Sequence, residues 1–316
     1  MINSSESGAE VSGLRRPRVS VCIPAYQAER HLRSTIDSVL AQDYLDFEVV
    51  IVDNNSTDGT REILETIHDD RVRVVRNTTT LPIYDNWNLA VRDARGEFIK
   101  LVCADDLITP ECITEQIAVF EQNRDVTLVS GRTDFVDDDG RLLRPARGIC
   151  GIVGRHSGRR VVSATVRSGS NPIGPTAAAM FRREDFDRCG GYIRHSLFPN
   201  VSDVDLWARL IRDGHFFGMA RTVASFRIGS GSVTATTTAR SLLCQQREFS
   251  RHLINDPHWN ISTRDRIIGW FNCYDKQLRR TVLYAMSNYR AWRQRTRRTG
   301  LPLVDHWPMT SATGFR

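Results

Sequence analysis

The sequence comprises 316 residues, of which 41% are hydrophobic and 25% are charged, with a formal net charge of +6. This composition is that of an ordinary globular protein, and the length suits one large α/β unit with an appendage. No run approaches the roughly eighteen consecutive apolar residues of a membrane-spanning helix, and residues 1–18 lack the apolar block of a secretory signal.

The N-terminal segment and the cysteines indicate a disordered start and a reducing compartment. Residues 1–18 are polar, and we interpret them as a disordered lead-in. Seven cysteines are scattered along the chain without a CxxC pair. An odd, dispersed set favours reduced thiols over a disulfide framework or a zinc site, and so predicts a cytoplasmic protein.

Short apolar runs alternate with helical periodicity through the first 130 residues. Strands are expected at residues 19–24, 47–53, 72–77, 97–102 and 126–130. Helices are expected between them, near residues 32–40, 56–67, 86–94 and 110–122. This alternation implies right-handed βαβ crossovers, and therefore an α/β fold with a mostly parallel, Rossmann-like sheet flanked by helices.

The second half gives weaker signals. The stretch 140–175 is rich in glycine and arginine and lacks clear periodicity, so we expect a long loop or an irregular edge there. Residues 203–212 are expected to form a helix, and the chain from residue 238 onward has helical periodicity. Apolar residues at 267, 271, 274, 278, 282, 285 and 289 have near-heptad spacing, which favours packing against the rest of the protein.

Two acidic clusters follow predicted strands, where open α/β sheets bind their ligands. Asp53 ends the second strand and precedes the polar run NNSTDG. An acid there can bind the ribose or base of a nucleotide, although a polar turn with a helix cap explains it equally well.

Asp105 and Asp106 follow the fourth strand. Adjacent carboxylates repel each other and so favour Mg²⁺ or Mn²⁺ at that place; the alternative is a solvated turn.

A third acidic cluster opens the predicted helix 203–212. A carboxylate at a helix N-terminus is stabilised as the anion, so capping alone explains Asp203 and Asp205. The functional alternative is a general base that removes the proton from an attacking hydroxyl. The chain contains no GxSxG elbow, P-loop or HExxH motif that would indicate another chemistry.

Taken together, these segments resemble the inverting glycosyltransferases of family 2, which have the GT-A fold. The family's opening pattern is similar to VSVCIPAYQAERHLRSTIDSVLAQ followed by FEVVIVDNNSTDGT. Its metal-binding DxD segment is similar to GEFIKLVCADDLITP. Its acceptor-side segment is similar to NPIGPTAAAMFRREDFDRCGGY, and the segment with its catalytic base is similar to SDVDLWARLIRDG. The resemblance runs from about residue 19 to about residue 232.

The resemblance implies a domain organisation and roles for individual residues. A GT-A catalytic domain is expected over residues 19–235, with a nucleotide-binding half (19–130) and an acceptor half (131–235), followed by a helical extension over 236–316. Asp203 is implied as the catalytic base, with Asp205 as the alternative, and Asp105 and Asp106 are implied at the metal. The residues implied in donor binding are Pro24, Ala25, Tyr26, Asp53, Asn55, Asp105, Asp106 and Arg227.

Four positions depart from the family pattern. Cys103 replaces the first DxD acid, Asn54 a frequent second acid, and Ser202 the usual glutamate before the base. Gly229 stands where relatives often have a metal-contacting histidine. Metal binding is therefore expected to rest on Asp105 and water, and Arg227 is expected to reach a donor phosphate.

The function implied is metal-dependent transfer of a sugar from a nucleotide-diphosphate sugar, by default a UDP-sugar, to an acceptor hydroxyl. The expected setting is polysaccharide or cell-surface glycan synthesis, with a glycan or lipid-linked acceptor and no nucleic-acid partner. One alternative is a catalytically decayed nucleotide-sugar-binding module. Another is a nucleotidyltransferase, which ranks behind because the first strand ends in PAYQAE rather than in a glycine- and basic-rich phosphate loop.

Basic residues form two blocks without a carboxylate. Residues 141–183 contain nine arginines, which suit either a solvated loop or the binding of an acceptor or a phosphate. Residues 276–304 contain eight basic residues. For the C-terminal helices, the alternatives to simple packing are a homodimer and peripheral contact with the inner face of an anionic membrane.

Overall fold

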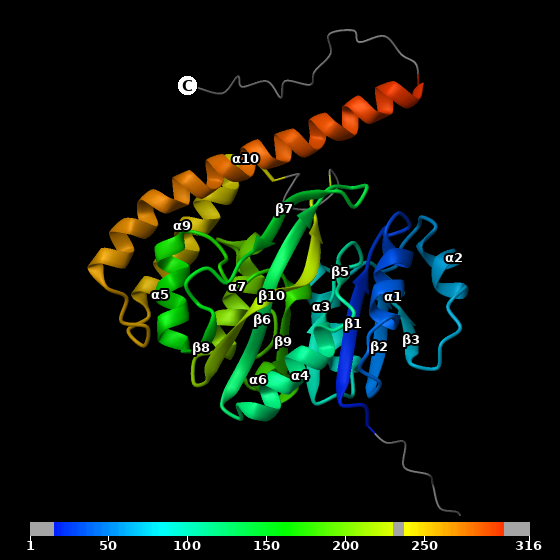
Figure 1. Ribbon diagram of the computed structural model, residues 1–316, viewed down its shortest axis with the longest axis horizontal. Helices are drawn as coiled ribbons and strands as arrows, with labels where there is room; N and C mark the ends of the chain where they lie inside the picture. The colour runs from blue at the N-terminus through cyan, green and yellow to red at the C-terminus, as the bar shows by residue number, and fades with distance from the viewer. Residues whose placement is uncertain (1–15, 230–236, 300–316) are drawn as a thin grey trace, which may run out of the picture.

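The computed structural model describes residues 16–229 and 237–299 (Figure 1). Most of the expected lead-in 1–18, and the expected domain boundary at residue 235, lie outside these ranges. The division into a catalytic domain and an extension stays a prediction. Within the described residues, no helix is long and apolar enough to cross a membrane.

The first half of the chain forms parallel strands covered by helices. The strands β1 (Val19–Ala25), β2 (Phe47–Asp53), β3 (Val72–Arg76) and β4 (Phe98–Leu101) lie in the order β3-β2-β1-β4. The connecting helices are α1 (Leu32–Leu40), α2 (Thr60–Glu65) and α3 (Ile83–Asp93). Every residue of β1 and β2 is buried, because helices cover both faces of this part of the sheet, and this explains their continuous apolar runs.

The sheet continues with strands of mixed direction in the order β4-β9-β6-β10-β5. Its further elements are β5 (Leu107–Ile108), α4 (Cys112–Gln122), β6 (Val126–Val136), β9 (Ala179–Arg182), α6 (Arg183–Arg188), α7 (Ser202–Leu210) and β10 (His215–Arg227). β9 is antiparallel to both β4 and β6, whereas β6 and β10 are parallel. The predicted α/β sheet flanked by helices is confirmed.

Of the two alternatives for residues 140–175, the long loop was wrong, and the edge region describes part of the stretch. This stretch contains β7 (Leu142–Arg147), β8 (Gly154–Ser157) and α5 (Gly158–Ser168). β7 pairs only with β6 and is mostly exposed, so its side chains carry little apolar signal. In α5, arginines alternate with a narrow buried face formed by Val161, Val162 and Val166.

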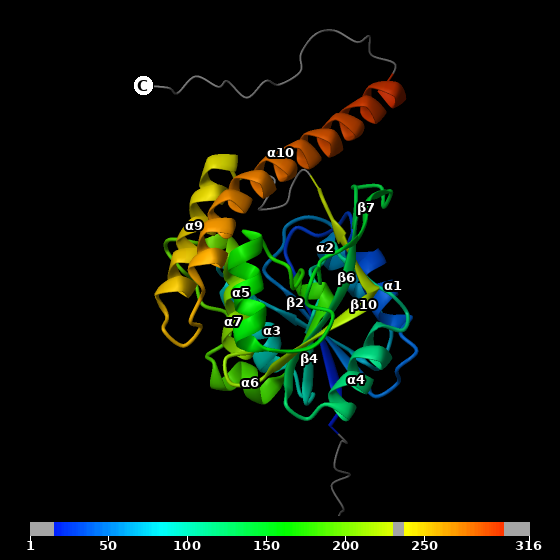
Figure 2. The same ribbon diagram turned by 60° about the vertical axis from the view of Figure 1, so that its left-hand side comes forward.

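The C-terminal helices α9 (Ala239–Asn255) and α10 (Thr263–Thr299) pack beside α5 (Figures 1 and 2). α10 approaches α5 closely through Gly269, where an added Cβ would lie 2.2 Å from the carbonyl oxygen of Val166. Cys273, one turn later, is buried against Gly169 at the end of α5. The contact with the body is therefore made by small residues of α10.

The near-heptad apolar stripe of α10 does not pack against the body as expected. Phe271 is 63% exposed and Leu278 is 67% exposed, and Ile267 and Val282 are exposed as well. The stripe and the Gly269–Cys273 side lie on different faces of the helix, so the periodicity identified an amphipathic helix but not its buried face. The side chain of Tyr289 lies outside the described residues.

Candidate active site

The ends of β1 and β2 bring the predicted nucleotide-binding residues together. Ala25 and Asp53 are direct partners in the parallel ladder, and the Asn54 N–H donates to the Ala25 carbonyl at 2.8 Å. Pro24 and Ala25 are buried, so they can offer a ligand little more than backbone. Tyr26 follows the strand with 53% of its surface exposed, which leaves its ring free to stack on a base.

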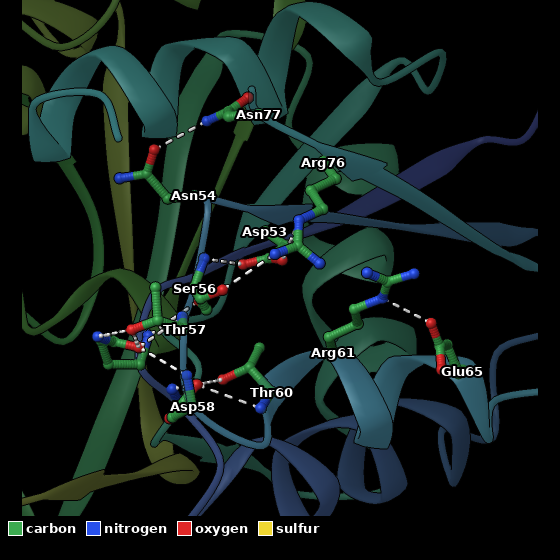
Figure 3. Close-up of polar contacts among 12 residues, drawn as sticks. Asp53, Asn54, Ser56, Thr57, Asp58, Thr60, Arg61, Glu65, Arg76 and Asn77 are labelled. Atoms are coloured by element: carbon green, nitrogen blue, oxygen red, sulfur yellow. Dashed lines mark hydrogen bonds and ion pairs between the residues drawn. The ribbon is translucent and has the colours of Figure 1, made fainter. Parts of the chain in front are cut away.

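Asp53 is buried and only partly satisfied (Figure 3). Its Oδ1 accepts from the Ser56 N–H at 3.0 Å, and its Oδ2 lies 3.5 Å from Arg76 Nε in an ion pair. Oδ2 has no hydrogen bond to any described residue. Because buried polar atoms are rarely left without a hydrogen bond, this oxygen suits a donor group of a nucleotide. Asn55, the residue after the Asn54 corner, has a φ of 59° and so shapes the turn through its left-handed backbone.

The amide of Asn54 is used inside the protein. Its Oδ1 accepts from Asn77 Nδ2 at 2.8 Å (Figure 3). The same oxygen accepts from the Leu81 N–H at 2.9 Å, and Asn54 Nδ2 donates to the Leu81 carbonyl. These bonds connect the end of β2 to the end of β3 and to the segment before α3. Asn54 therefore holds these three segments together beside the predicted nucleotide site.

The two acids after β4 have different environments. Asp106 is fully buried, and its Oδ1 accepts from the backbone N–H of Arg227 at 3.0 Å. Burial raises the pKa of Asp106 well above its usual range, and the charge of Asp105 adds to this effect. Asp105 is half-buried, and burial raises its pKa too. The Oδ2 of Asp106 has no hydrogen bond to any described residue. The expected contact of Asp106 with the metal or donor sugar stays a prediction, and the burial of its carboxylate makes Asp105 the more accessible acid of the pair.

Arg227 at the end of β10 is also buried. Its Nε donates to the Asp105 carbonyl at 3.0 Å, and its Nη1 donates to the carbonyls of Asp137 and Asp138 at 3.0 and 3.1 Å. The guanidinium thus binds the turn after β4 and the turn after β6. Through these bonds Arg227 positions the turn that carries Asp105, and its expected contact with a donor phosphate stays a prediction.

Asp203 lies in the first turn of α7 and is half-buried. Asn171 Nδ2 donates to its Oδ2 at 3.2 Å. Burial raises the pKa of Asp203 to about 6, against opposing effects that include the Asn171 hydrogen bond. The sequence reasoning missed Asn171, and its only signal was its place in the acceptor-side segment.

Asp205, the alternative base, is buried and engaged in ion pairs. Its Oδ2 lies 2.8 Å from the Arg209 guanidinium and 3.1 Å from His195 Nε2. The Asp205 carboxylate is therefore engaged by the Arg209 guanidinium and the His195 ring. The structure therefore leaves Asp203 as the acid of this cluster that can meet a substrate.

The metal and base residues lie in one neighbourhood. The Cys103 thiol, 3.5 Å from the Thr176 hydroxyl, has a pKa raised well above its usual range by burial and by the charges of Asp106, Asp105 and Asp203. Asp105 from the β4 end and Asp203 from α7 therefore both act on the same side chain. Among the described residues, no group of three or more His, Cys, Asp or Glu side chains could hold a metal by itself.

Comparison with known proteins identifies the family to which the chain belongs. The family model described as glycosyl transferase family 2 matches residues 20–190, which is more than half of the chain. The chain belongs to glycosyl transferase family 2. It is therefore a glycosyltransferase, as the resemblance implied, and the nucleotidyltransferase alternative is set aside.

Relatives and solved structures are similar over most of the chain. An uncharacterized protein of Mycobacterium tuberculosis is 29% identical over 263 residues, covering 81% of this chain and 82% of its own length. The putative glycosyltransferase EpsE of Bacillus subtilis is 27% identical over 204 residues, covering 63% and 68%.

Two solved structures have the same fold. S. aureus TarS in complex with UDP-GlcNAc has a TM-score of 0.60 at 16% identity, covering 76% of this chain and 67% of its own. The mannosyltransferase PcManGT from Pyrobaculum calidifontis, in complex with GDP-Man and Mn²⁺, has a TM-score of 0.56 at 19% identity, covering 88% and 76%. The GT-A fold is confirmed.

The different environments of Asp105 and Asp106 give a testable prediction. Asp105→Asn is expected to weaken Mn²⁺-dependent nucleotide binding about tenfold or more, because a metal ligand loses its charge. Asp106→Asn is expected to change it little, because the amide oxygen can still accept from the Arg227 N–H. Isothermal titration of each variant with nucleotide and Mn²⁺ measures this. Equal losses in the two variants would show that Asp106 reaches the metal.

Proposed function

We propose that this family 2 glycosyltransferase, whose donor is a nucleotide-diphosphate sugar, transfers the sugar to an acceptor hydroxyl with inversion, using Asp203 as the general base. The observation that carries the proposal is the environment of Asp203. It is half-buried, held by Asn171 and free of ion pairs among the described side chains, whereas Asp205 two residues later is occupied. A carboxylate with a pKa near 6 is ionised at pH 7 and still basic enough to take a proton.

The donor site is assigned to the ends of β1 and β2. Support comes from the unsatisfied Oδ2 of Asp53, the exposed ring of Tyr26 and the backbone at Pro24 and Ala25. Similar folds were solved with UDP-GlcNAc and with GDP-Man, so a UDP-sugar is the first donor to test and a GDP-sugar the second. Asn55 belongs to this site through its backbone.

A divalent cation fits beside Asp105. Mg²⁺ and Mn²⁺ take hard oxygen ligands, and one carboxylate with substrate phosphates and water is a common set for Mg²⁺. Asp105 offers that carboxylate, and Arg227 holds its backbone by a hydrogen bond to its carbonyl oxygen. Bound there, the metal would neutralise charge on the departing diphosphate. Because no group of three such ligands occurs among residues 16–229 and 237–299, the proposed cation would be held largely by the donor's own diphosphate.

The chain's own residues then accomplish a single displacement. Asn171 keeps the Asp203 carboxylate oriented, and Asp203 accepts the proton of the acceptor hydroxyl. The acceptor oxygen forms a bond to the anomeric carbon as the bond from that carbon to the diphosphate oxygen breaks. Attack opposite the leaving group inverts the configuration. The acceptor is assigned as a glycan or lipid-linked hydroxyl in polysaccharide or cell-surface glycan synthesis, on the strength of the family resemblance.

Removing the base tests the proposal. Asp203→Asn is expected to lower the transfer rate by about 10²- to 10⁴-fold while leaving nucleotide binding unchanged. The exposed Asp213→Asn is a matched control expected to keep full activity. Transfer measured by product chromatography that stays near the wild-type rate in Asp203→Asn would contradict the assignment. Nucleotide binding without any transfer in the wild-type protein would favour the decayed module.

The pH dependence gives a second prediction. Because burial raises the pKa of Asp203 to about 6, the base is protonated and inactive below that pH, so kcat/KM is expected to fall on the acid side of pH 6. Asn171 donates to the ionised form, so Asn171→Ala is expected to move this acid limb to higher pH. A pH profile whose acid limb lies near the ordinary aspartate value of about 4, or does not respond to Asn171→Ala, would contradict the base assignment.

For localisation we propose peripheral contact of α10 with an anionic membrane surface. The exposed stripe of Ile267, Phe271, Leu278 and Val282 offers apolar side chains to the interface. The eight basic residues between 276 and 304, with no carboxylate, complement anionic head groups. In a homodimer through the same helices, these like charges would be brought together. α10 also crosses the side of the molecule to which the parallel strands run, so contact would bring a lipid-linked acceptor near the site (Figure 1).

Vesicle flotation tests this contact. The protein is expected to float with vesicles that contain phosphatidylglycerol and much less with pure phosphatidylcholine, because both charge and apolar burial contribute. The double variant Phe271→Ser/Leu278→Ser is expected to lose most of this binding. Leu45→Ser, at a leucine that is 83% exposed far from α10 in the sequence, is the matched control. Unchanged flotation, with a stable dimer broken by the double variant in light scattering, would assign the stripe to dimerisation instead.

A further inference from the structure

Two cations of α10 lie together on one pocket wall, and one of them acts on the proposed base. Lys276 is half-buried and Arg280 is exposed, and one helical turn separates them, so they lie on the same side of α10. Neither makes a hydrogen bond or ion pair with the described part of the chain. The charge of Arg280 reaches Asp203, where it opposes the rise in pKa that burial causes. The C-terminal helix therefore contributes directly to the electrostatics of the active site.

These cations line a small pocket between the end of α5, α9 and α10. Its other walls include Gly169, Ser170, Gln246 and Gln277, and no lining residue is acidic. Backbone, hydroxyl and amide groups of this kind supply hydrogen-bond donors beside the two positive charges. Ser170 is followed directly by Asn171, which holds Asp203, so the pocket wall continues into the support of the base.

The neighbouring cations on α10 are arranged differently. Arg279 is exposed and pairs with Asp275 at 2.9 Å within the helix. Arg247 on α9 donates to the Tyr274 hydroxyl at 3.2 Å. Lys276 and Arg280 differ from these cations because they pair with no side chain in the part of the chain that the structure describes, and both line the pocket. Unpaired cations in such a recess are suited to an anionic ligand.

We propose that Lys276 and Arg280 form an anion subsite on the acceptor side of the active site, and that the acceptor carries a phosphate group close to the hydroxyl that is attacked. The assignment rests on the proposed function of Asp203, since groups around the base meet the acceptor. A lysine point charge combined with an arginine fork and neutral donors suits the several oxygens of a phosphate. The phosphate belongs either to a soluble acceptor or to a lipid head group.

The subsite can be tested without the donor. Isothermal titration of the full chain with sn-glycerol 3-phosphate is expected to show binding, and titration with glycerol is expected to show none. Lys276→Gln/Arg280→Gln is expected to weaken glycerol 3-phosphate binding by about tenfold or more, whereas Arg279→Gln should leave it unchanged. No binding to the wild-type chain, or equal affinity in the three proteins, would overturn the proposal. Because no nucleotide is present, this outcome is independent of whether Asp203 acts as the base.

Two further measurements test whether Arg280 binds the phosphate or only tunes Asp203, and whether the phosphate belongs to a lipid or to a soluble acceptor. If Arg280 only tuned Asp203, Arg280→Gln would shift the acid limb of the pH profile to higher pH and leave glycerol 3-phosphate affinity intact, which would overturn the subsite. Competition of soluble glycerol 3-phosphate by phosphatidylglycerol vesicles, equal in the wild-type chain and in the Arg279→Gln variant, would support the subsite and assign the phosphate to a lipid. Binding of glycerol 3-phosphate that such vesicles leave unchanged would support a soluble phosphorylated acceptor.

Discussion

The buried guanidinium of Arg227 is the constraint on which the active site depends. It binds the carbonyls of Asp105, Asp137 and Asp138, while its backbone N–H binds the buried carboxylate of Asp106. One residue at the end of β10 thereby fixes the turns that follow β4 and β6. A buried charge with these partners is costly to disturb, so the turn that presents Asp105 has little freedom.

The same division between supporting and reacting acids recurs on the acceptor side. Asp205 pairs with Arg209 and contacts the His195 ring, which anchors the start of α7, and Asp203 two residues earlier is left partly exposed. At both places, one acid of a close pair is enclosed by protein and the other is available. In the proposed mechanism, this arrangement leaves one acid for the metal and one for the base, although Cys103 and Gly229 depart from the family pattern.

The parallel half of the fold could be predicted because β1, β2 and β4 are buried on both faces and leave continuous apolar runs. β7 and α5 could not be predicted, because an exposed edge strand and an arginine-rich helix carry little apolar periodicity. The expectation that ligand-binding acids follow parallel strands placed Asp53 at the end of β2 and Asp105 after β4, as the structure has them. It could not separate Asp105 from Asp106, or recognise Arg280, because burial and neighbours depend on segments far away in the sequence.

The most direct measurement of the central claim is thermal unfolding of the full chain with UDP, GDP, TDP and CDP, each with and without Mn²⁺. A ligand that binds only the folded state raises the midpoint by mass action. If the ends of β1 and β2 bind the nucleotide and Asp105 binds the metal with its diphosphate, one of these nucleotides will raise the midpoint, and will do so much more with Mn²⁺ present. No shift with any of the four in the presence of Mn²⁺ would contradict the account and favour a module that has lost its donor site.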